Sequence, residues 1–332
     1  MNLLITGGAG FIGSHLAKKF LLDEYKVTIV DSFKPAYKSN LCEIRLKSLL
    51  KYKNLKVYRA DLSRISKSGI SQIVMNQDVI IHLAAYPGVQ MSNKKPLEYF
   101  DNNILSFHNI VKAALNSNIN KFFFASSSSI YGDVFFRNKL DKAYSAQRKS
   151  FYADTKWFNE LESFALSGIE GFQEISQVAL RFFTVFGPYG RPDMAYWKFA
   201  NLIESNLPIN LNGRFGGKRD FTPVSFVVNF ISDLLESNLQ RGLTSVNIGL
   251  QKSSTTKYFA SILAEAMNKK VNFTYSSRSN FEVKKTKADM SKSLRLLNSK
   301  ITKPNLEEEI KNFAKWYMSM PKKIRFNQFS TN

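Results

Sequence analysis

The chain has 332 residues, 44% of them hydrophobic, which is enough for one large domain or two smaller ones. No apolar run approaches the roughly 20 residues of a membrane span, and the first residues enter a strand-like segment directly, so we expect a cytoplasmic protein without membrane contact. The single cysteine, Cys42, excludes an internal disulfide, and the three scattered histidines predict no metal site. The formal charge of +21 is spread along the chain without dense clusters, which favours a basic surface over a nucleic-acid partner.

Short strands and amphipathic helices alternate through the first half of the chain. Amphipathic stretches such as 14–24 and 97–116 lie between runs rich in β-branched or aromatic residues. Those runs are 2–7, 26–31, 56–61, 78–85, 121–128 and 176–183. This order predicts parallel strands joined by crossover helices, and hence an α/β fold with a Rossmann-type doubly wound parallel sheet.

The second half of the chain is less regular. Short strands are expected near 220–224, 245–249 and 271–276, and helices near 254–267 and 305–319. We therefore expect a smaller C-terminal α/β lobe. The predicted division is 1–180 and 181–332, with the chain crossing between the two lobes.

A glycine-rich segment, Gly7-Gly8-Ala9-Gly10-Phe11-Ile12-Gly13, follows the first strand directly and precedes a helix. Its first glycine permits a tight turn, the third lets backbone N–H groups approach a pyrophosphate, and the last allows the helix to pack on the strand. Asp31 ends the second strand, where a carboxylate can accept the ribose hydroxyls of NAD and would repel the 2′-phosphate of NADP. The sequence therefore predicts bound NAD, with Asp61 at the end of the third strand as an adenine contact.

A tyrosine and a lysine follow the fifth strand. The glycine spacing Gly-x-x-Gly-x-x-Gly resembles that of the short-chain dehydrogenase/reductase superfamily, and Tyr152-Ala-Asp-Thr-Lys156 matches its Tyr-x-x-x-Lys pair. Positions i and i+4 share one helix face, so the lysine ammonium can lie beside the tyrosine ring. Nearby positive charge favours the phenolate of a side chain whose ordinary pKa is about 10, which makes Tyr152 a candidate general base.

Four serines, Ser126–Ser129, lie at the end of the fifth strand. A general base needs a neighbouring hydroxyl that fixes the reacting group. Ser127 stands at a spacing before Tyr152 that is similar to that of sugar-nucleotide epimerases. We expect Ser127 to orient the substrate, with Ser128 or Ser129 as second candidates.

Most of the chain resembles NAD-dependent sugar-nucleotide epimerases and dehydratases, in blocks such as HLAA at 82–85 and PLEYFDNN at 96–103. The segment RFFTVFGPYGRPDMA at 181–195 is similar to the signature of UDP-glucuronate 4-epimerases, as is the loop 31–50. The resemblance implies an isomerase that converts UDP-glucuronate to UDP-galacturonate through transient oxidation at C-4. It also implies a homodimer that pairs through the helices near 97–116 and 152–166.

The resemblance further implies which residues bind NAD and the sugar nucleotide. Residues 1–180 would bind NAD and carry the catalytic pair, and residues 181–332 would bind the sugar nucleotide. Additional NAD contacts are expected from Phe11, Ile12, Leu62, Leu83, Ala84, Ala85 and Asn102. Thr184 and Arg191 would face the sugar carboxylate and the nucleotide, and the other expected substrate contacts are Arg219 and Arg278 at the diphosphate, together with Gly88.

Several alternatives stay open at this point. Gln90 stands where these epimerases usually have arginine, and Pro223-Val-Ser-Phe226 replaces a Tyr-Val-Asp-Asp-like run, so UDP-glucose or UDP-N-acetylglucosamine is an alternative substrate. Dehydratases carry Asp-Glu at the positions of Ser128-Ser129, and UDP-glucuronate decarboxylases carry glutamate at the second, so the two serines favour an epimerase. An alternative of another class is a nucleic-acid-binding protein on the same fold, which the retained tyrosine and lysine disfavour.

Overall fold

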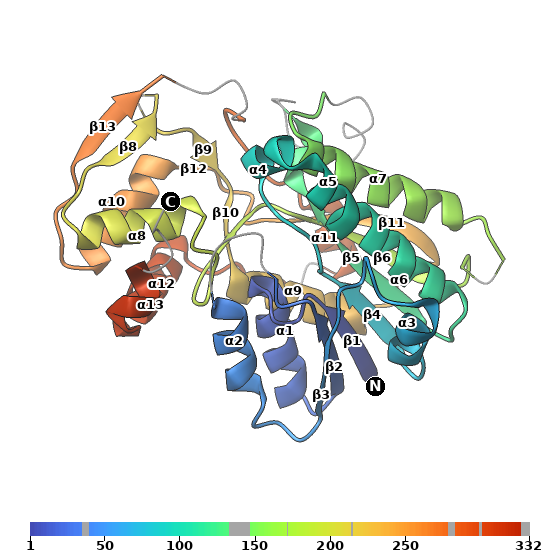
Figure 1. The fold of residues 1–332 in the computed structure, drawn as a ribbon. Coiled ribbons are helices and arrows are strands. Elements are labelled where there is room, and N and C mark those ends of the chain that lie inside the picture. The colour runs from blue at the N-terminus through green and yellow to red at the C-terminus, as the bar shows by residue number, and fades with distance from the viewer. Residues whose placement is uncertain are drawn as a thin grey trace.

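A seven-stranded parallel sheet forms the centre of the larger lobe (Figure 1). The structure is a computed structural model that describes residues 1–34, 40–132, 147–170, 172–213, 215–277, 283–298 and 301–326. In sheet order the strands are β11 (Gly242–Ile248), β6 (Ser176–Phe182), β5 (Lys121–Ser127), β4 (Val79–His82), β1 (Asn2–Thr6), β2 (Lys26–Asp31) and β3 (Leu55–Arg59). The strand order reverses between β1 and β4, which confirms the predicted Rossmann-type doubly wound fold.

Helices cover both faces of this sheet. Alternate residues of β1 point to opposite faces, so Leu3 and Ile5 belong to one buried cluster and Leu4 to another. The first cluster includes residues of α1 (Phe11–Leu22) and α9 (Val224–Glu236), and the second includes residues of α3 (Lys67–Val74) and α6 (Ser106–Leu115). Because both faces are covered, β1, β4 and β5 are buried as nearly continuous apolar runs rather than alternating.

The helix predicted over 97–116 is observed as three successive helical segments. They are α5 (Pro96–Tyr99), the π-helical η1 (Phe100–Leu105) and α6. The other helical elements of the larger lobe are α2 (Leu41–Leu49), α4 (Val89–Lys94), the 3₁₀ turn η2 (Ser128–Tyr131), α7 (Phe151–Leu166) and α11 (Ser291–Leu296). The π-helical turn is wider than an α-helical turn, and this widening changes the direction of the side chains on either side of η1.

The smaller lobe contains three two-stranded pairs and four helices in the described part of the chain (Figure 1). The pairs are β7 (Thr184–Phe186) with β10 (Phe221–Pro223), β9 (Lys218–Arg219) with β12 (Ser254–Thr255), and β8 (Ile209–Asn212) with β13 (Phe273–Ser276). The helices are α8 (Ala195–Glu204), α10 (Thr256–Ala266), α12 (Leu306–Ser319) and α13 (Lys322–Phe326). Trp197 packs against Phe313 and Tyr317 at the centre of this lobe.

The chain crosses between the lobes more than once. After β6 it enters the smaller lobe, then returns through α9 and β11, and β11 extends the large sheet beside β6. Pro223 is the last residue of β10 and the N-cap residue of α9. Proline fits the end of a strand because it has no backbone N–H to donate to a neighbouring strand. No helix in the described residues is long and apolar enough to cross a membrane.

Candidate active site

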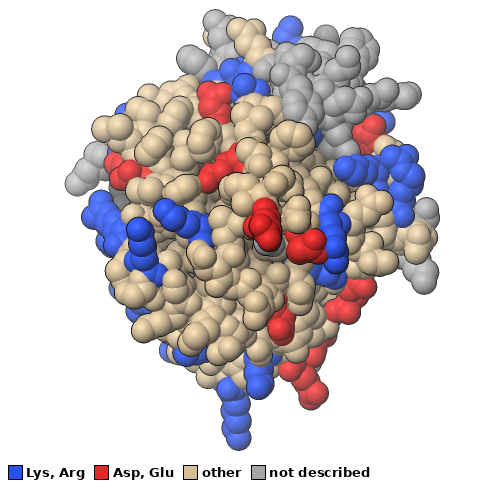
Figure 2. Space-filling view, turned by 90° about the vertical axis from the view of Figure 1, so that its right-hand side faces the viewer, with Lys and Arg blue, Asp and Glu red and all other residues tan. Residues whose placement is uncertain are grey.

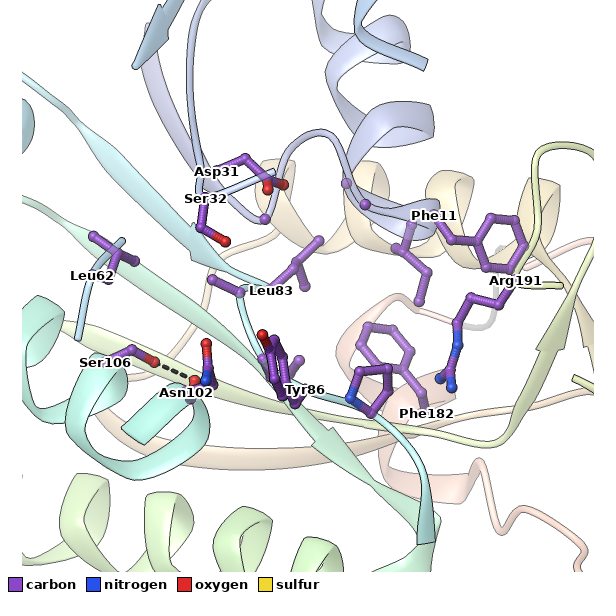
Figure 3. A pocket seen from close by; sticks show the side chains of 18 of the residues that line it. Phe11, Asp31, Ser32, Leu62, Leu83, Tyr86, Asn102, Ser106, Phe182 and Arg191 are labelled. Atoms are coloured by element: carbon purple, nitrogen blue, oxygen red, sulfur yellow. Dashed lines mark hydrogen bonds between the residues drawn. The ribbon is translucent and has the colours of Figure 1, made fainter. Parts of the chain in front are cut away.

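A cavity opens at the carboxyl ends of the parallel strands, where the strand order reverses. Its lining comes from the loops after β1 to β4, the ends of β5 and β6, and the smaller lobe. Figure 3 shows Asp31 and Leu62 toward one end of the cavity and Phe182 and Arg191 toward the other. In doubly wound folds this crevice is the place where nucleotide cofactors bind.

Every residue for which an NAD contact is predicted lines this cavity. These residues are Gly7, Gly10, Phe11, Ile12, Gly13, Asp31, Asp61, Leu62, Leu83, Ala84, Ala85, Asn102, Tyr152 and Lys156. Ser32, Tyr86 and Ser106 also line it and were not predicted. Tyr86 lies between the two ends of the cavity, directly after the Leu83–Ala85 segment (Figure 3).

The glycine-rich loop is packed so closely that side chains would not fit. Gly7 has a φ of +66°, and a Cβ there would lie 2.7 Å from the backbone nitrogen of Ala84. A Cβ at Gly13 would lie 2.3 Å from the carbonyl oxygen of Gly7. The N-terminus of α1 follows at once and lies at the cavity, which is an arrangement suited to binding a pyrophosphate.

Asp31 is held in place at the end of β2 by the backbone. Its Oδ2 accepts a hydrogen bond from the Ala9 N–H at 3.0 Å, and its Oδ1 accepts one from the Phe33 N–H at 2.8 Å. Burial raises the pKa of this carboxyl, while these hydrogen bonds and the positive charge of Arg45 act in the opposite direction. The carboxylate is thus fixed at the position where it could accept ribose hydroxyls.

The predicted catalytic pair lies in the first two turns of α7. Ser150 caps this helix by accepting a hydrogen bond from the Ala153 N–H at 3.2 Å. Tyr152 and Lys156 are one turn apart, and both line the cavity. The helix cap therefore sets the start of α7, and the helix geometry sets the separation of the two side chains.

The environment of Tyr152 has opposing effects on its pKa. Burial raises the pKa, whereas a hydrogen bond with Ser127 and the positive charge of Arg191 lower it, and the net direction is upward. The hydroxyl of Ser127, which is predicted to orient the substrate, therefore lies within hydrogen-bonding distance of the Tyr152 hydroxyl. In this state the phenol keeps its proton at neutral pH, so a base at this position needs additional positive charge nearby.

Lys156 is buried with an unpartnered amine. Its side chain is 2% exposed, and Nζ has no hydrogen-bond partner among the described residues. Burial lowers the pKa of Lys156 to about 7. An amine of this kind is suited to a ligand that brings hydroxyl acceptors into the cavity, as the ribose of a nucleotide does.

The four serines of β5 and η2 have different surroundings. Ser126 is buried and donates to Glu160 Oε1. Ser127 is the N-cap residue of the 3₁₀ turn η2, and its hydroxyl accepts a hydrogen bond from the Ser129 N–H at 3.1 Å. Ser128 and Ser129 lie in that turn and do not line the cavity, whereas Ser126 and Ser127 do.

A buried ion pair beneath the serines was not predicted. Glu160 of α7 accepts from Arg181 of β6, with Nε and Oε1 2.9 Å apart, and the two side chains are 4% and 2% exposed. Arg181 also donates to the Tyr131 hydroxyl, which donates to Asn247 of β11. The sequence signals that could have found it are an arginine inside an apolar strand and a glutamate four positions after Lys156.

Asn102 and Asn103 lie in the π turn and point in different directions. Asn102 lines the cavity, where Ser106 donates to its backbone oxygen (Figure 3). Asn103 is buried, accepts from the Tyr86 N–H at 2.7 Å and donates to the Tyr86 carbonyl at 3.0 Å. Asn103, which was not predicted, thereby fixes the loop after β4 that lines the cavity.

The predicted substrate contacts are only partly brought together. Arg191 lines the cavity and is ion-paired with Asp193. A Cβ at Gly88, whose φ is +114°, would lie 3.8 Å from Nη2 of Arg191. Thr184 lies between Phe183 and Val185, which line the cavity, but is not itself among the lining residues.

Of the two predicted diphosphate contacts, only Arg219 belongs to the described residues, and it is separate from this cavity. Arg219 lies in β9 of the smaller lobe, where Nη1 donates to the Lys218 carbonyl at 2.9 Å, and it does not line the cavity. Arg278 lies outside the described residues. No group of three or more potential metal-binding side chains occurs within the described part of the chain.

Together these features define a class of protein. A dinucleotide fits the glycine-rich loop, the fixed carboxylate of Asp31 and the amine of Lys156, which has no partner among the described residues. The tyrosine beside Ser127 is suited to proton transfer to or from a hydroxyl. The site is therefore that of a nucleotide-dependent enzyme of the short-chain dehydrogenase/reductase type.

Comparison with known proteins narrows this class. Residues 3–249 match the NAD dependent epimerase/dehydratase family, and the chain belongs to that family. NAD is accordingly its cofactor. An uncharacterized protein of Methanocaldococcus jannaschii is 35% identical, with 96% of each chain covered. A UDP-glucuronate 4-epimerase of Thermodesulfobacterium geofontis is 33% identical over 94% of this chain and 95% of that protein. The crystal structure of UDP-glucuronic acid 4-epimerase from Bacillus cereus with UDP-glucuronic acid and NAD has a TM-score of 0.86 at 29% identity, covering 95% of this chain and 98% of that one.

Proposed function

We propose that the protein is an isomerase that interconverts UDP-glucuronate and UDP-galacturonate by epimerisation at C-4. The observation that carries this proposal is the Tyr152 hydroxyl, hydrogen-bonded to Ser127 in a cavity that Lys156 and Arg191 also line. The names of the relatives and the solved complex with UDP-glucuronic acid support the choice of substrate. Serines at 128 and 129, in place of an acid and a base, support epimerisation over dehydration.

The residues of the site have separate roles in this reaction. Tyr152 removes the proton of the C-4 hydroxyl, Ser127 orients that hydroxyl, and the Lys156 ammonium stabilises the phenolate. NAD would be held by the glycine-rich loop and Asp31, and when bound it would supply the acceptor and donor for the C-4 hydride. The 4-keto sugar rotates in the cavity between these steps, and Tyr152 then gives its proton back to the opposite epimer. The overall reaction is redox-neutral.

A uronate places one additional demand on the site. Its 4-keto form is a β-keto acid, which loses carbon dioxide when the breaking bond is aligned with the ketone. Arg191, with its guanidinium in the cavity, and Thr184, beside two lining residues, would hold the carboxylate out of that alignment. As part of the same proposal, Gly88 leaves room for the sugar, and Arg219 and Arg278 bind the diphosphate.

The proposal also includes a homodimer and a cytoplasmic location. The homodimer is supported by an apolar patch of exposed side chains on two neighbouring helical segments, α5–η1 and α7. The patch consists of Leu97, Phe100, Phe158, Leu161 and Phe164. An exposed apolar cluster of this kind is typical of a surface that another protein chain covers.

The proposal is tested by incubating the purified protein with a panel of UDP-sugars and resolving the products. We expect conversion of UDP-glucuronate to UDP-galacturonate without released carbon dioxide. Tyr152→Phe should lose at least about a hundredfold in kcat while still carrying NAD, since it removes only the base. Turnover of UDP-glucose or its N-acetylated analogue, with no conversion of any uronate, would refute the substrate assignment.

A further inference from the structure

Arg45 is a buried arginine of α2 that the proposed reaction does not use. Its side chain is 1% exposed, and its guanidinium donates to backbone carbonyls of two segments distant in sequence. Nε and Nη2 donate to the Tyr189 carbonyl at 3.0 and 2.8 Å, and Nη2 also donates to the Gly190 carbonyl at 3.1 Å. Nη1 donates to the Ala9 carbonyl at 3.3 Å. One side chain thus joins α2, the glycine-rich loop and the segment before Arg191.

On the cofactor side, Arg45 acts on the residues that would hold NAD. The carbonyl of Ala9 accepts from Arg45, while the N–H of Ala9 donates to the Asp31 carboxylate. The guanidinium charge also lowers the pKa of Asp31, against the effect of burial. Arg45 therefore supports both the position and the ionisation of the carboxylate at the ribose end of the cavity.

On the substrate side, Arg45 fixes the backbone that leads to Arg191. Tyr189 has a φ of +55°, a conformation that a non-glycine residue adopts only when its surroundings hold it there. At Gly190 a Cβ would lie 2.1 Å from the Tyr196 hydroxyl, and that hydroxyl accepts from the Arg191 N–H at 2.8 Å. The segment is therefore held on one side by Arg45 and on the other by Tyr196, and it positions the guanidinium of Arg191 in the cavity.

We propose that Arg45 is a positioning residue that couples NAD binding to the placement of Arg191, so that NAD and UDP-glucuronate each strengthen the binding of the other. NAD that contacts Asp31 and the glycine-rich loop fixes Ala9, and Arg45 transmits this order to Tyr189 and Gly190. The coupling is reciprocal, because it is a single free energy shared by the two ligands. The identity of the second ligand rests on the proposed function.

The test compares NAD affinity with and without saturating UDP-glucuronate, in protein from which NAD has been removed. In the unaltered chain we expect UDP-glucuronate to lower the Kd of NAD about tenfold. In Arg45→Lys the ratio should fall to about one, because a lysine ammonium lacks the planar fork that reaches both carbonyl groups. The KM for UDP-glucuronate should rise in the variant more than its kcat falls.

Arg325→Lys is a matched control. Arg325 is also buried, but it belongs to α13 and pairs with Glu204 of α8, away from the cavity. Its replacement should lower the free energy of unfolding while leaving the affinity ratio near tenfold. A loss of coupling in both variants would indicate a general loss of structure and would overturn the proposal.

Hydrogen exchange of the unaltered chain gives a second measurement that needs no variant. NAD alone should slow exchange at the amides of Gly190 and Arg191, relative to NAD-free protein. Unchanged exchange there, or coupling that Arg45→Lys retains in full, would overturn the proposal. Neither measurement needs turnover, so coupled binding without epimerisation would refute only the proposed function.

Discussion

Lys156 combines deep burial with an amine that has no hydrogen-bond partner among the described residues. Burial lowers its pKa from 10.5 to about 7. Between these two values the unfolded chain binds more protons at this residue than the folded chain does. The contribution of Lys156 to stability is therefore fully present above pH 10.5 and is lost as the pH falls through about 7.

We predict that the free energy of unfolding of the NAD-free protein increases with pH between about 7 and 10 through this residue, by up to about 1.4 kcal/mol per pH unit. Lys156→Met should lack this part of the pH dependence, because methionine does not titrate. Urea unfolding at several pH values measures the difference. Lys112→Met, on the exposed face of α6, should keep the slope of the unaltered chain. Equal slopes for all three proteins would contradict the prediction.

The raised pKa of Tyr152 indicates what the Lys156 ammonium would contribute to proton transfer. Burial raises that pKa in the NAD-free state, so the phenol is a weak base there. A ligand whose hydroxyls accept hydrogen bonds from Lys156 favours the ammonium, and the ammonium in turn favours the phenolate. If Tyr152 is the base, as proposed, we therefore expect proton transfer only when the cofactor is present.

Among the secondary-structure elements, the ion pair of Glu160 and Arg181 joins α7 to β6 and holds the serine end of β5 through Ser126. Both charged side chains are buried, so the loss of one leaves the other uncompensated. This pair therefore connects α7, which carries Tyr152, to β5, which carries Ser127.

We predict that Glu160→Gln lowers the free energy of unfolding by about 3–5 kcal/mol, because Arg181 then keeps a buried charge without its counterion. Chemical denaturation measures this loss. Replacing both residues by methionine should recover much of it, since no buried charge then remains. Glu265→Gln, on the exposed face of α10, should change stability by less than about 0.5 kcal/mol. A Glu160→Gln protein as stable as this control would show that the pair contributes little.

The sequence predicted the elements whose signals are local. The strands β1 to β6 are short runs rich in β-branched or aromatic residues, and the glycine-rich loop, Asp31 and the Tyr152–Lys156 pair are each specified within a few residues of chain. These positions follow a strand or share one helix face, so their places in the cavity follow from the fold alone.

The unpredicted features depend on residues that are far apart in the chain. Arg45 meets carbonyls 144 and 145 positions away, and Asn103 meets Thr155 52 positions away. The π turn of η1 keeps the same apolar spacing as a helix, so periodicity could not reveal that it directs Asn102 and Asn103 apart. Such contacts are determined by tertiary packing, which a single sequence does not display.

For the whole molecule, the formal charge of +21 is the most unusual property. Figure 2 shows the side on which α6 and α7 lie, with lysines and arginines scattered mainly toward its margins rather than gathered in one cluster. A dispersed charge of this kind attracts anions over a distance without specifying one. It would speed the encounter with an anionic nucleotide sugar, and this effect would weaken as salt is added.

The apolar patch on α5–η1 and α7 predicts the oligomeric state. Its five side chains are between 43% and 80% exposed, and uncharged residues cover much of the face in Figure 2. A glutamate at Leu161 would have to be buried without a partner if two copies paired there. We therefore predict that the unaltered chain sediments as a dimer and Leu161→Glu as a folded monomer at micromolar concentration. Leu207→Glu changes a side chain that is 53% exposed in the smaller lobe, so this variant should remain a dimer. A dimeric Leu161→Glu protein would exclude this patch as the interface, because the new charge would then have to lie in solvent.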